Sequence, residues 1–223
     1  GVDRPVETVS WHEAQAFLAR LNERVQGLEL VLPSEAQWEY ACRAGTTSAT
    51  YAGAMPDPEG AGLAAIGEIA WFGENSGGES QPVARKRPNP WGLYDMLGNV
   101  DEWCADAWSG RYDGGALYGG TQKYGGADAR GALCVIRGGS WGVGARPCRA
   151  AYRSWDHPDD RYDFLGFRPA RGQGERSDGR GAVPVEAAWR GRSPDPEPVA
   201  APTASRSLRL SLSDGAELRG HTD

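Results

Sequence analysis

The chain has 223 residues, enough for one domain with a full hydrophobic core and some additional segments. Its 32 Gly, 15 Pro and 9 Trp favour a loop-rich fold with buried indoles over a helical bundle. The formal net charge of −6, without a basic block or a long apolar run, argues against nucleic-acid and membrane partners, and we expect neither.

The four cysteines are too widely spaced in the sequence to make a zinc-binding pair or a disulfide framework. They are Cys42, Cys104, Cys134 and Cys148. We expect them to be reduced, buried thiols in a cytoplasmic protein. No signal peptide is visible, and the first residue is Gly1 rather than Met, so we expect a fragment, a processed product or a trimmed chain.

Two helices are predicted near the N-terminus. The first begins at Ser10, which can form a capping box with Glu13, and it ends before Gly27. The second begins at Ser34, where Gln37 completes a second capping box. The apolar faces consist of Ala14, Phe17, Leu18, Leu21 and Val25 in the first helix and of Trp38, Ala41 and Cys42 in the second. We expect both helices to be structural, without carboxylates paired for acid–base catalysis.

The chain around and after these helices is predicted to hold little regular structure. Residues 28–32 form a short apolar strand or turn. Residues 46–90 are irregular and need buried Trp side chains or a metal ion to hold them in place. Residues 106–133 are rich in Gly and Tyr and are typical of an exposed loop or insertion, and a strand follows at 133–137.

A tight turn at Gly98-Asn99, followed by a strand, is the centre of the densest motif, residues 89–104. The side chains of Asn99 and Glu102 and the carbonyls between them have the oxygen chemistry that Ca²⁺ prefers. In the alternative, Asn99 adopts a positive φ and Glu102 pairs with an arginine. The spacing of these residues alone favours the alternative.

Residues 142–165, here called the surface segment, lie between Arg137-Gly138-Gly139-Ser140-Trp141 and Gly166-Phe167-Arg168. The surface segment is polar, carries both charge signs and still holds four aromatic residues. It is either a binding site displayed on a scaffold or a long loop whose rings pack on the core. The candidate ligand-binding residues are Val143, Ala145, Arg146, Tyr152, Ser154, Trp155, Asp156, His157, Asp160, Tyr162, Asp163 and Phe164. A binding site predicts an exposed patch made of Tyr152, Trp155, Tyr162 and Phe164.

The composition changes after Arg171. Residues 172–205 are rich in Pro, Gly, Arg and Asp, which is typical of a flexible linker. Residues 206–223 contain a stretch with period-two alternation and then Asp214-Gly215, so we expect the first hairpin of a further β module or a disordered tail. One domain is therefore predicted over residues 1–171.

Five motifs, in this order, resemble the formylglycine-generating enzyme (sulfatase-modifying factor) family. They are Val9-Ser10-Trp11 and residues 32–41, 91–103, 137–141 and 166–168. The resemblance covers about residues 5–171 and implies an α+β fold of the C-type lectin kind. That fold has two helices, a small twisted antiparallel sheet and much irregular structure. The family's usual N-terminal strands are absent here; they lie upstream of Gly1 or have been lost.

The same resemblance favours a structural calcium ion at Asn99 and Glu102. Asp101 stands where many relatives carry Trp, at what we expect to be the surface of that turn.

For catalysis, the resemblance implies copper held by two cysteines placed five apart just after the Gly-Gly-Ser-aromatic motif. Here the first position holds Val143, and the second is Cys148 when counted from Trp141. Counted back from Pro158-Asp159, Cys148 instead matches a non-catalytic position. Because two thiolates are needed to hold Cu(I), we expect no copper and no catalytic residues. Cys148 is expected to be a partner of Cys42, as thiol or disulfide.

Related non-heme iron enzymes use a histidine cluster, whereas His12, His157 and His221 are far apart in this sequence. The sequence therefore predicts a non-catalytic domain that recognises an unknown protein or small molecule within a larger, bacterial, multidomain protein. One alternative is the variable binding protein of a diversity-generating retroelement, although such variable segments usually lie near the chain's end. The other alternative is an oxidase of the formylglycine-generating kind that acts on cysteine.

Overall fold

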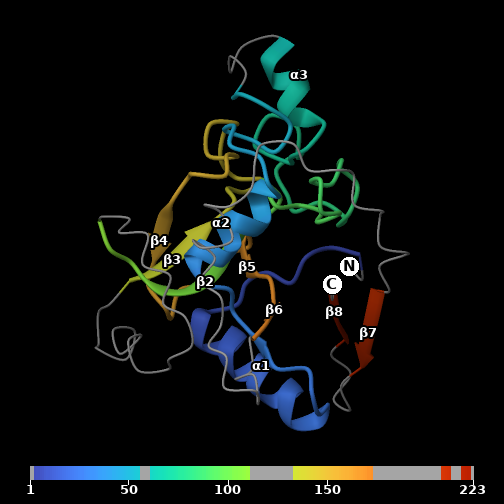
Figure 1. Ribbon diagram of the computed structural model, residues 1–223, viewed down its shortest axis with the longest axis vertical. Coiled ribbons are helices and arrows are strands. Elements are labelled where there is room, and N and C mark those ends of the chain that lie inside the picture. Colours follow the sequence, from blue (N-terminus) through green and yellow to red (C-terminus); the bar gives the residue numbers. More distant parts are fainter. Residues whose placement is uncertain (1–2, 56–60, 111–132, 173–206, 212–216, 222–223) are drawn as a thin grey trace.

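The computed structural model describes residues 3–55, 61–110 and 133–172, together with two strands at 207–211 and 217–221. The three helices are α1 (Trp11–Arg24), α2 (Glu35–Arg43) and α3 (Ala61–Gly67). Figure 1 shows α1 and α3 at opposite ends of the long axis, with α2 and the main sheet between them. None of the helices in the described part of the chain is long and apolar enough to cross a membrane.

Both predicted helices and their capping boxes are confirmed. The Ser10 side chain accepts a hydrogen bond from the backbone N–H of Glu13, and Ser34 does the same for Gln37. The predicted apolar face of α1 extends one turn too far, because Val25 lies beyond its last residue and is 39% exposed. The helix α3 was not predicted; it is a short apolar and Gly-containing stretch inside the region expected to be irregular.

The main sheet has four strands in the order β4-β3-β2-β5. These strands are β2 (Asp101–Ala107), β3 (Cys134–Arg137), β4 (Ser154–Asp156) and β5 (Leu165–Phe167). β3 pairs antiparallel with both β2 and β4, whereas β5 runs parallel to β2. The α+β class is confirmed, but the sheet is mixed rather than purely antiparallel. A second, two-stranded sheet joins β1 (Leu30–Val31) to β6 (Ala170–Arg171).

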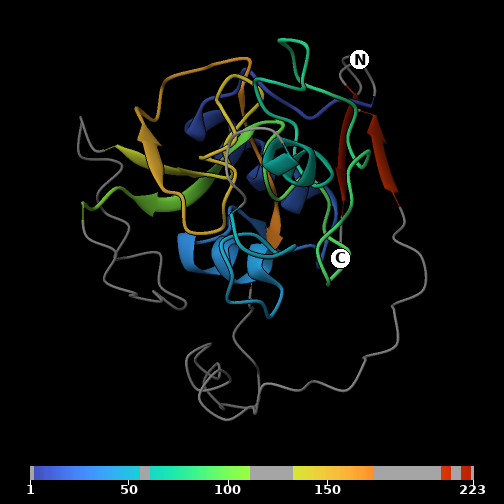
Figure 2. The same cartoon turned by 90° about the horizontal axis from the view of Figure 1, so that it is seen from above.

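The central strands β2 and β3 of the main sheet are largely buried on both faces, whereas the edge strand β4 is partly exposed. Successive residues of a strand point to opposite faces, and along β3 they enter different cores. Val135 belongs to one core with Trp38, while Ile136 belongs to the other with Trp103. Figure 2 shows the helices and strands from above. The strands are therefore held between two hydrophobic clusters, which makes the sheet a rigid base for the segments that leave it.

The irregular region after α2 is held by buried side chains. The hydroxyl of Tyr51 lies 3.1 Å from the carbonyl oxygen of Ile69 and 3.0 Å from that of Arg87. Phe72 is buried in the same core as Trp38. Tyr51 and Phe72 therefore help to hold this region in place, in addition to the tryptophans that the sequence suggested.

Two predicted segments lie largely outside the described residues: the insertion at 106–133 between positions 111 and 132, and the linker at 172–205 from position 173 onward. Beyond the linker, β7 (Ser207–Ser211) pairs antiparallel with β8 (Glu217–His221). That pairing is the geometry expected of a hairpin. Whether the hairpin begins a further module stays a prediction.

Candidate functional site

The surface segment starts and ends on the main sheet. It leaves after β3, supplies the edge strand β4 and returns as β5. The Trp141 indole N–H donates to the carbonyl of Asp163 at 3.0 Å, which joins the two ends of the segment directly. The backbone N–H of Trp141 also donates to the carbonyl of Asn99 at 2.8 Å. The segment is therefore anchored to a scaffold at both ends, and β4 was missed because it lies within a predicted loop.

Most of the candidate ligand-binding residues reach solvent. Trp155 is 47% exposed and Tyr162 is 38% exposed. Exposed or partly exposed as well are Val143, Arg146, Tyr152, Ser154, Asp156, His157, Asp160, Asp163 and Phe164. Ala145 does not belong with them, because it is only 4% exposed and packs in the core with Trp38.

The four aromatic residues form separate groups. The rings of Tyr162 and Phe164 are stacked, with centroids 4.9 Å apart and planes inclined by 4°. Trp141 meets Phe164 edge to face at 6.5 Å. Trp155 lies on β4, and the Arg149 guanidinium lies over the Tyr152 ring at 5.9 Å. The predicted patch is thus one stacked group and two isolated rings.

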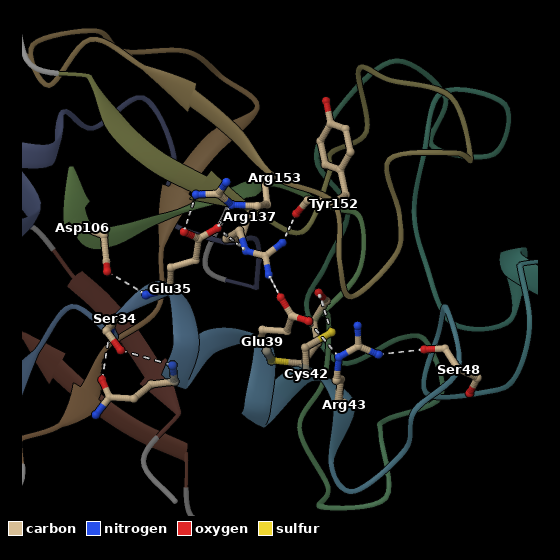
Figure 3. Close-up of polar contacts among 12 residues, drawn as sticks. Ser34, Glu35, Glu39, Cys42, Arg43, Ser48, Asp106, Arg137, Tyr152 and Arg153 are labelled. Atoms are coloured by element: carbon tan, nitrogen blue, oxygen red, sulfur yellow. Dashed lines mark hydrogen bonds and ion pairs between the residues drawn. The ribbon is translucent and has the colours of Figure 1, made fainter. Parts of the chain in front are cut away.

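A buried ionic network lies beneath the middle of the surface segment and connects it to α2 (Figure 3). Arg137 is fully buried, and its Nε lies 3.3 Å from Oε1 of Glu35. Its two other guanidinium nitrogens donate to the Glu39 carboxylate and to the carbonyl of Tyr152. The Arg153 guanidinium donates hydrogen bonds to both carboxylate oxygens of Glu35, with Nη2 at 2.8 Å from Oε2. Two consecutive residues of the surface segment are thereby fixed to one helix.

Sequence reasoning missed this network, since α2 was expected to be structural without further detail. Two signals were available. Glu35 and Glu39 are four residues apart and flank the buried Trp38, and Arg137 ends an otherwise apolar strand. A buried charge is costly unless it is paired. The two carboxylates on α2 therefore predict a buried cation, and the arginine at the end of the strand predicts a carboxylate partner. The Arg137 guanidinium also lies 5.1 Å from the ring of Trp38. We interpret the network as a means of positioning Tyr152 and Arg153.

The tight turn before β2 has the geometry of the alternative interpretation. Asn99 has a φ of 65°, and its side chain exchanges hydrogen bonds of 2.9 and 3.0 Å with the backbone of Gln81. The Glu102 carboxylate accepts from the Trp38 indole at 2.7 Å and from Arg168 at 2.9 Å. These contacts occupy the oxygens expected to bind calcium, so the two side chains as they lie do not fit a calcium shell.

No group of three or more His, Cys, Asp or Glu able to hold a metal ion occurs within the described residues. Calcium at the turn stays a prediction for metal analysis.

Asp101 is buried rather than at the surface of the turn, contrary to expectation. Its Oδ1 accepts a 3.0 Å hydrogen bond from the backbone N–H of Gly139. Burial raises the pKa of this carboxyl to about 7, although the hydrogen bond acts in the opposite direction. Asp101 therefore supports the glycine turn from which the surface segment departs.

All four cysteines are buried and free, which confirms the expected buried thiols. Cys42 and Cys148 belong to the same hydrophobic core, so of the two forms expected for this pair, the thiol is the one present. Burial raises the pKa of the Cys42 thiol to about 12 and raises that of Cys148 well above its usual value. Thiolate formation, which nucleophilic attack and metal binding require, is therefore opposed at both positions.

Comparisons with known proteins agree with this geometry. Residues 1–173 match the sulfatase-modifying factor enzyme 1-like domain. The formylglycine-generating enzyme of Streptomyces coelicolor is 35% identical over 176 residues, which cover 75% of this chain and 52% of that protein. The inactive C-alpha-formylglycine-generating enzyme 2 of Bos taurus is 32% identical over 184 residues, covering 76% and 51% of the two chains.

Among solved structures, Treponema denticola variable protein 1 superposes with a TM-score of 0.57 at 28% identity, covering 74% of this chain and 70% of that one. The mixed sheet between two cores and the anchored surface segment define an α+β domain of the formylglycine-generating enzyme type. The chain belongs to the sulfatase-modifying factor enzyme 1-like family. It spans about half the length of the two curated relatives named above.

Proposed function

We propose that this domain is a non-catalytic recognition module that binds a protein or small-molecule ligand on the surface segment. One observation carries the proposal: counted from Trp141, the two positions at which the resemblance places copper-binding cysteines hold Val143 and a single, fully buried thiol, Cys148. Burial opposes the thiolate form of Cys148, and one thiol cannot supply the two ligands that Cu(I) requires. The chain therefore has the family's fold without the pair of copper-binding cysteines with which the family's enzymes oxidise cysteine.

The surface segment supports the binding half of the proposal. Its exposed residues include aromatic, acidic, basic and hydroxyl side chains, the mixture typical of adaptable binding surfaces. Trp155 and Tyr162 offer large contact areas with few rotatable bonds. The rigid anchors at Arg137 and Trp141 reduce the ordering cost of binding. Similarity to an inactive family member and to a variable protein is consistent with a recognition role.

A ligand screen with two matched variants tests the proposal. Displayed peptide libraries and glycan arrays would be probed with the whole chain and with the double variant Trp155→Ala, Tyr162→Ala. The control is Tyr40→Ala, Trp91→Ala, which removes two exposed rings of similar exposure elsewhere on the molecule. We expect a ligand that the first variant loses and the control keeps. Ligands that bind all three proteins equally would contradict the proposal.

A second candidate is a variable binding protein of a diversity-generating retroelement, which the similarity to Treponema denticola variable protein 1 favours. Sequencing the coding region across many cells of one population tests it. Variation confined to codons 142–165 would support this candidate, and uniform codons there would contradict it.

A further inference from the structure

The last turn of the surface segment is held by a part of the chain that is far from it in sequence. We call residues 157–162 the outer turn and residues 7–13 the strap. The backbone N–H of Trp11, at the start of α1, donates to the carbonyl of Pro158 at 3.1 Å. The N–H groups in the first turn of a helix have no partner within the helix, so water can satisfy this donor when the outer turn moves away.

Two side-chain contacts join the strap to the outer turn near solvent. The Arg161 guanidinium pairs with the Glu13 carboxylate at 2.8 Å, and both side chains are about half exposed. His12 Nε2 lies 3.8 Å from the carboxylate of Asp159, and these two side chains are exposed as well. Exposed pairs stabilise little, because water solvates the separated groups and salt screens their attraction. The side chains therefore hold the outer turn only weakly.

The backbone of the strap is strained at Thr8. Its φ of 59° lies in the left-handed region, which a β-branched residue rarely adopts. In this conformation the N–H of Thr8 donates to the carbonyl of Tyr162 at 3.0 Å, which is the second backbone contact with the outer turn. A residue held in such a conformation stores strain that the surrounding contacts have to offset. Rotation of Thr8 to an ordinary φ therefore relieves strain as it breaks this hydrogen bond.

The strap is held unequally on the two sides of Thr8. After Thr8, the carbonyl of Val9 accepts a 2.9 Å hydrogen bond from the indole of the fully buried Trp103. Before Thr8, Glu7 is joined to Gly166 of β5 by an isolated antiparallel bridge rather than by a ladder. Thr8 thus lies where a firmly held part of the chain meets a weakly held one, which is the usual place of a hinge.

The first half of the surface segment is attached in a different way. The buried network fixes Tyr152 and Arg153 to α2 through the guanidinium of Arg137 and the carboxylate of Glu35. Breaking a buried ion pair leaves a charge uncompensated, so this half is expected to stay in place while the fold is intact. The two halves of one surface therefore differ in how easily they leave the scaffold.

From this difference we infer that the outer turn and the strap separate by local opening about Thr8, while the network and the main sheet stay folded. Local opening with a free energy below that of global unfolding is expected where contacts are few, polar and exposed. Tyr162 moves with the outer turn, so opening changes the shape of the surface segment. The opening is a property of the fold, whereas its effect on ligand binding rests on the proposed function.

Hydrogen exchange of individual backbone amides, followed by NMR on the whole 223-residue chain, tests the inference. The N–H groups of Thr8 and Trp11 report the opening directly, because the outer turn accepts their hydrogen bonds. The N–H groups of Val135 and Ile136, on the buried strand β3 that pairs on both sides, are the reference for global unfolding. We expect protection factors about 100-fold lower at Thr8 and Trp11 than at the two reference amides. Low concentrations of urea should leave exchange at Thr8 and Trp11 unchanged, because local opening exposes little surface.

Two substitutions at position 8 separate backbone strain from the loss of the hydroxyl. Thr8→Asn removes the β-branch, and because Asn tolerates the left-handed region, the closed state becomes less strained. We expect the protection factor of the Trp11 amide to rise about 5-fold in this variant. Thr8→Val is the matched control, because it keeps the β-branch and removes only the hydroxyl, so we expect no rise.

Arg161→Ala weakens the opposite side of the contact. It should lower the protection factor of the Trp11 amide by up to about 5-fold, because it removes one exposed ion pair, and it should leave the Val135 amide unchanged. Equal protection of Trp11 and Val135 in the wild type would overturn the inference, as would equal protection of Trp11 in Thr8→Asn and Thr8→Val. Parallel losses at Trp11 and Val135 in Arg161→Ala would show that the opening is not local.

The exchange experiment and the ligand screen fail independently. A ligand that depends on Trp155 and Tyr162 leaves the proposed function standing whatever the exchange rates at the strap. Rapid exchange at Thr8 and Trp11 leaves the local opening standing even if the screen finds no ligand.

Discussion

Two charged regions of this molecule differ in how their carboxylates are placed: the network under the surface segment, and the partly exposed pair Asp156 and Asp160 within the segment. In the network, Glu35 and Glu39 both form ion pairs with the fully buried Arg137, and Glu35 also pairs with Arg153. In the surface segment, the side chains of Asp156 and Asp160 form a hydrogen bond, and the hydroxyl of Tyr162 lies 3.5 Å from Asp160.

The difference separates structural charges from charges that are available to a ligand. A buried charge without a partner destabilises the folded state, so removing one charge of the network also makes its partners unfavourable. An exposed carboxylate remains solvated and can exchange water for a partner at little cost. We therefore expect variants of the network to change stability, and variants of the surface segment to change binding.

The largest effect is expected for Arg137→Ala. It leaves the buried Glu35 and the partly buried Glu39 with one cation fewer and frees the carbonyl of Tyr152. Breaking a buried ion pair from one side costs roughly 3 to 5 kcal/mol of unfolding free energy. Urea unfolding at pH 7 measures this loss.

Arg161→Ala is the matched control, because it removes an equally charged side chain that pairs with Glu13 at the surface. Surface pairs contribute only about 0 to 1 kcal/mol. Equal losses in the two variants would mean that the network is not the anchor described here.

A smaller effect, dependent on pH, is expected for Asp101→Asn. The carboxyl has a pKa of about 7 in the folded chain, above its ordinary value of 3.8, so the folded state holds the proton more tightly. Its contribution is fully present below pH 4 and is lost as the pH rises through 7. At pH 8 the variant should be more stable than the wild type by roughly 2 to 4 kcal/mol, with little difference near pH 4.

Thermal unfolding of both proteins at several pH values measures the Asp101 effect. A constant difference from pH 4 to pH 8 would show that Asp101 is not protonated in the folded state. If calcium binds at the adjacent turn, adding it should shift the titration to lower pH, which gives that prediction a second test.

The smallest effect on stability is expected for Trp155→Ser. The ring is 47% exposed on the edge strand β4, and surface substitutions of this kind usually change unfolding free energy by no more than about 0.5 kcal/mol. Binding of a ligand to the surface segment should nevertheless fall. A loss of stability as large as that of Arg137→Ala would mean that Trp155 stabilises the fold, and it would contradict the distinction between structural charges and the binding surface.

Local features of this fold could be predicted from the sequence, and long-range ones could not. The capping boxes at Ser10 and Ser34 depend on residues three apart, and both are present. The strand β4 was missed because its three residues become a strand only by pairing with β3. The contact between Arg137 and Glu39 joins positions 98 apart, so local patterns could suggest that each charge needs a partner but not that the two meet.

The candidate site divides in the same way. The exposure of Trp155 and Tyr162 matches one of the two alternatives that the aromatic residues of a polar segment had left open. Ala145 was misplaced because a small apolar side chain gives no signal that distinguishes core from surface. That Glu102 pairs with Arg168 could be seen only in the fold, since spacing within the turn was compatible with either calcium binding or an arginine partner.

Copper binding is the most direct test of the central claim, which is that the chain has the family's fold but no copper site. Metal content would be measured after purification without added metal, followed by copper titration of the wild type and of Cys148→Ser. We expect the two proteins to behave alike, because Cys148 is buried and position 143 is a valine. Stoichiometric copper in the wild type that is lost in Cys148→Ser would contradict the account and support an oxidase.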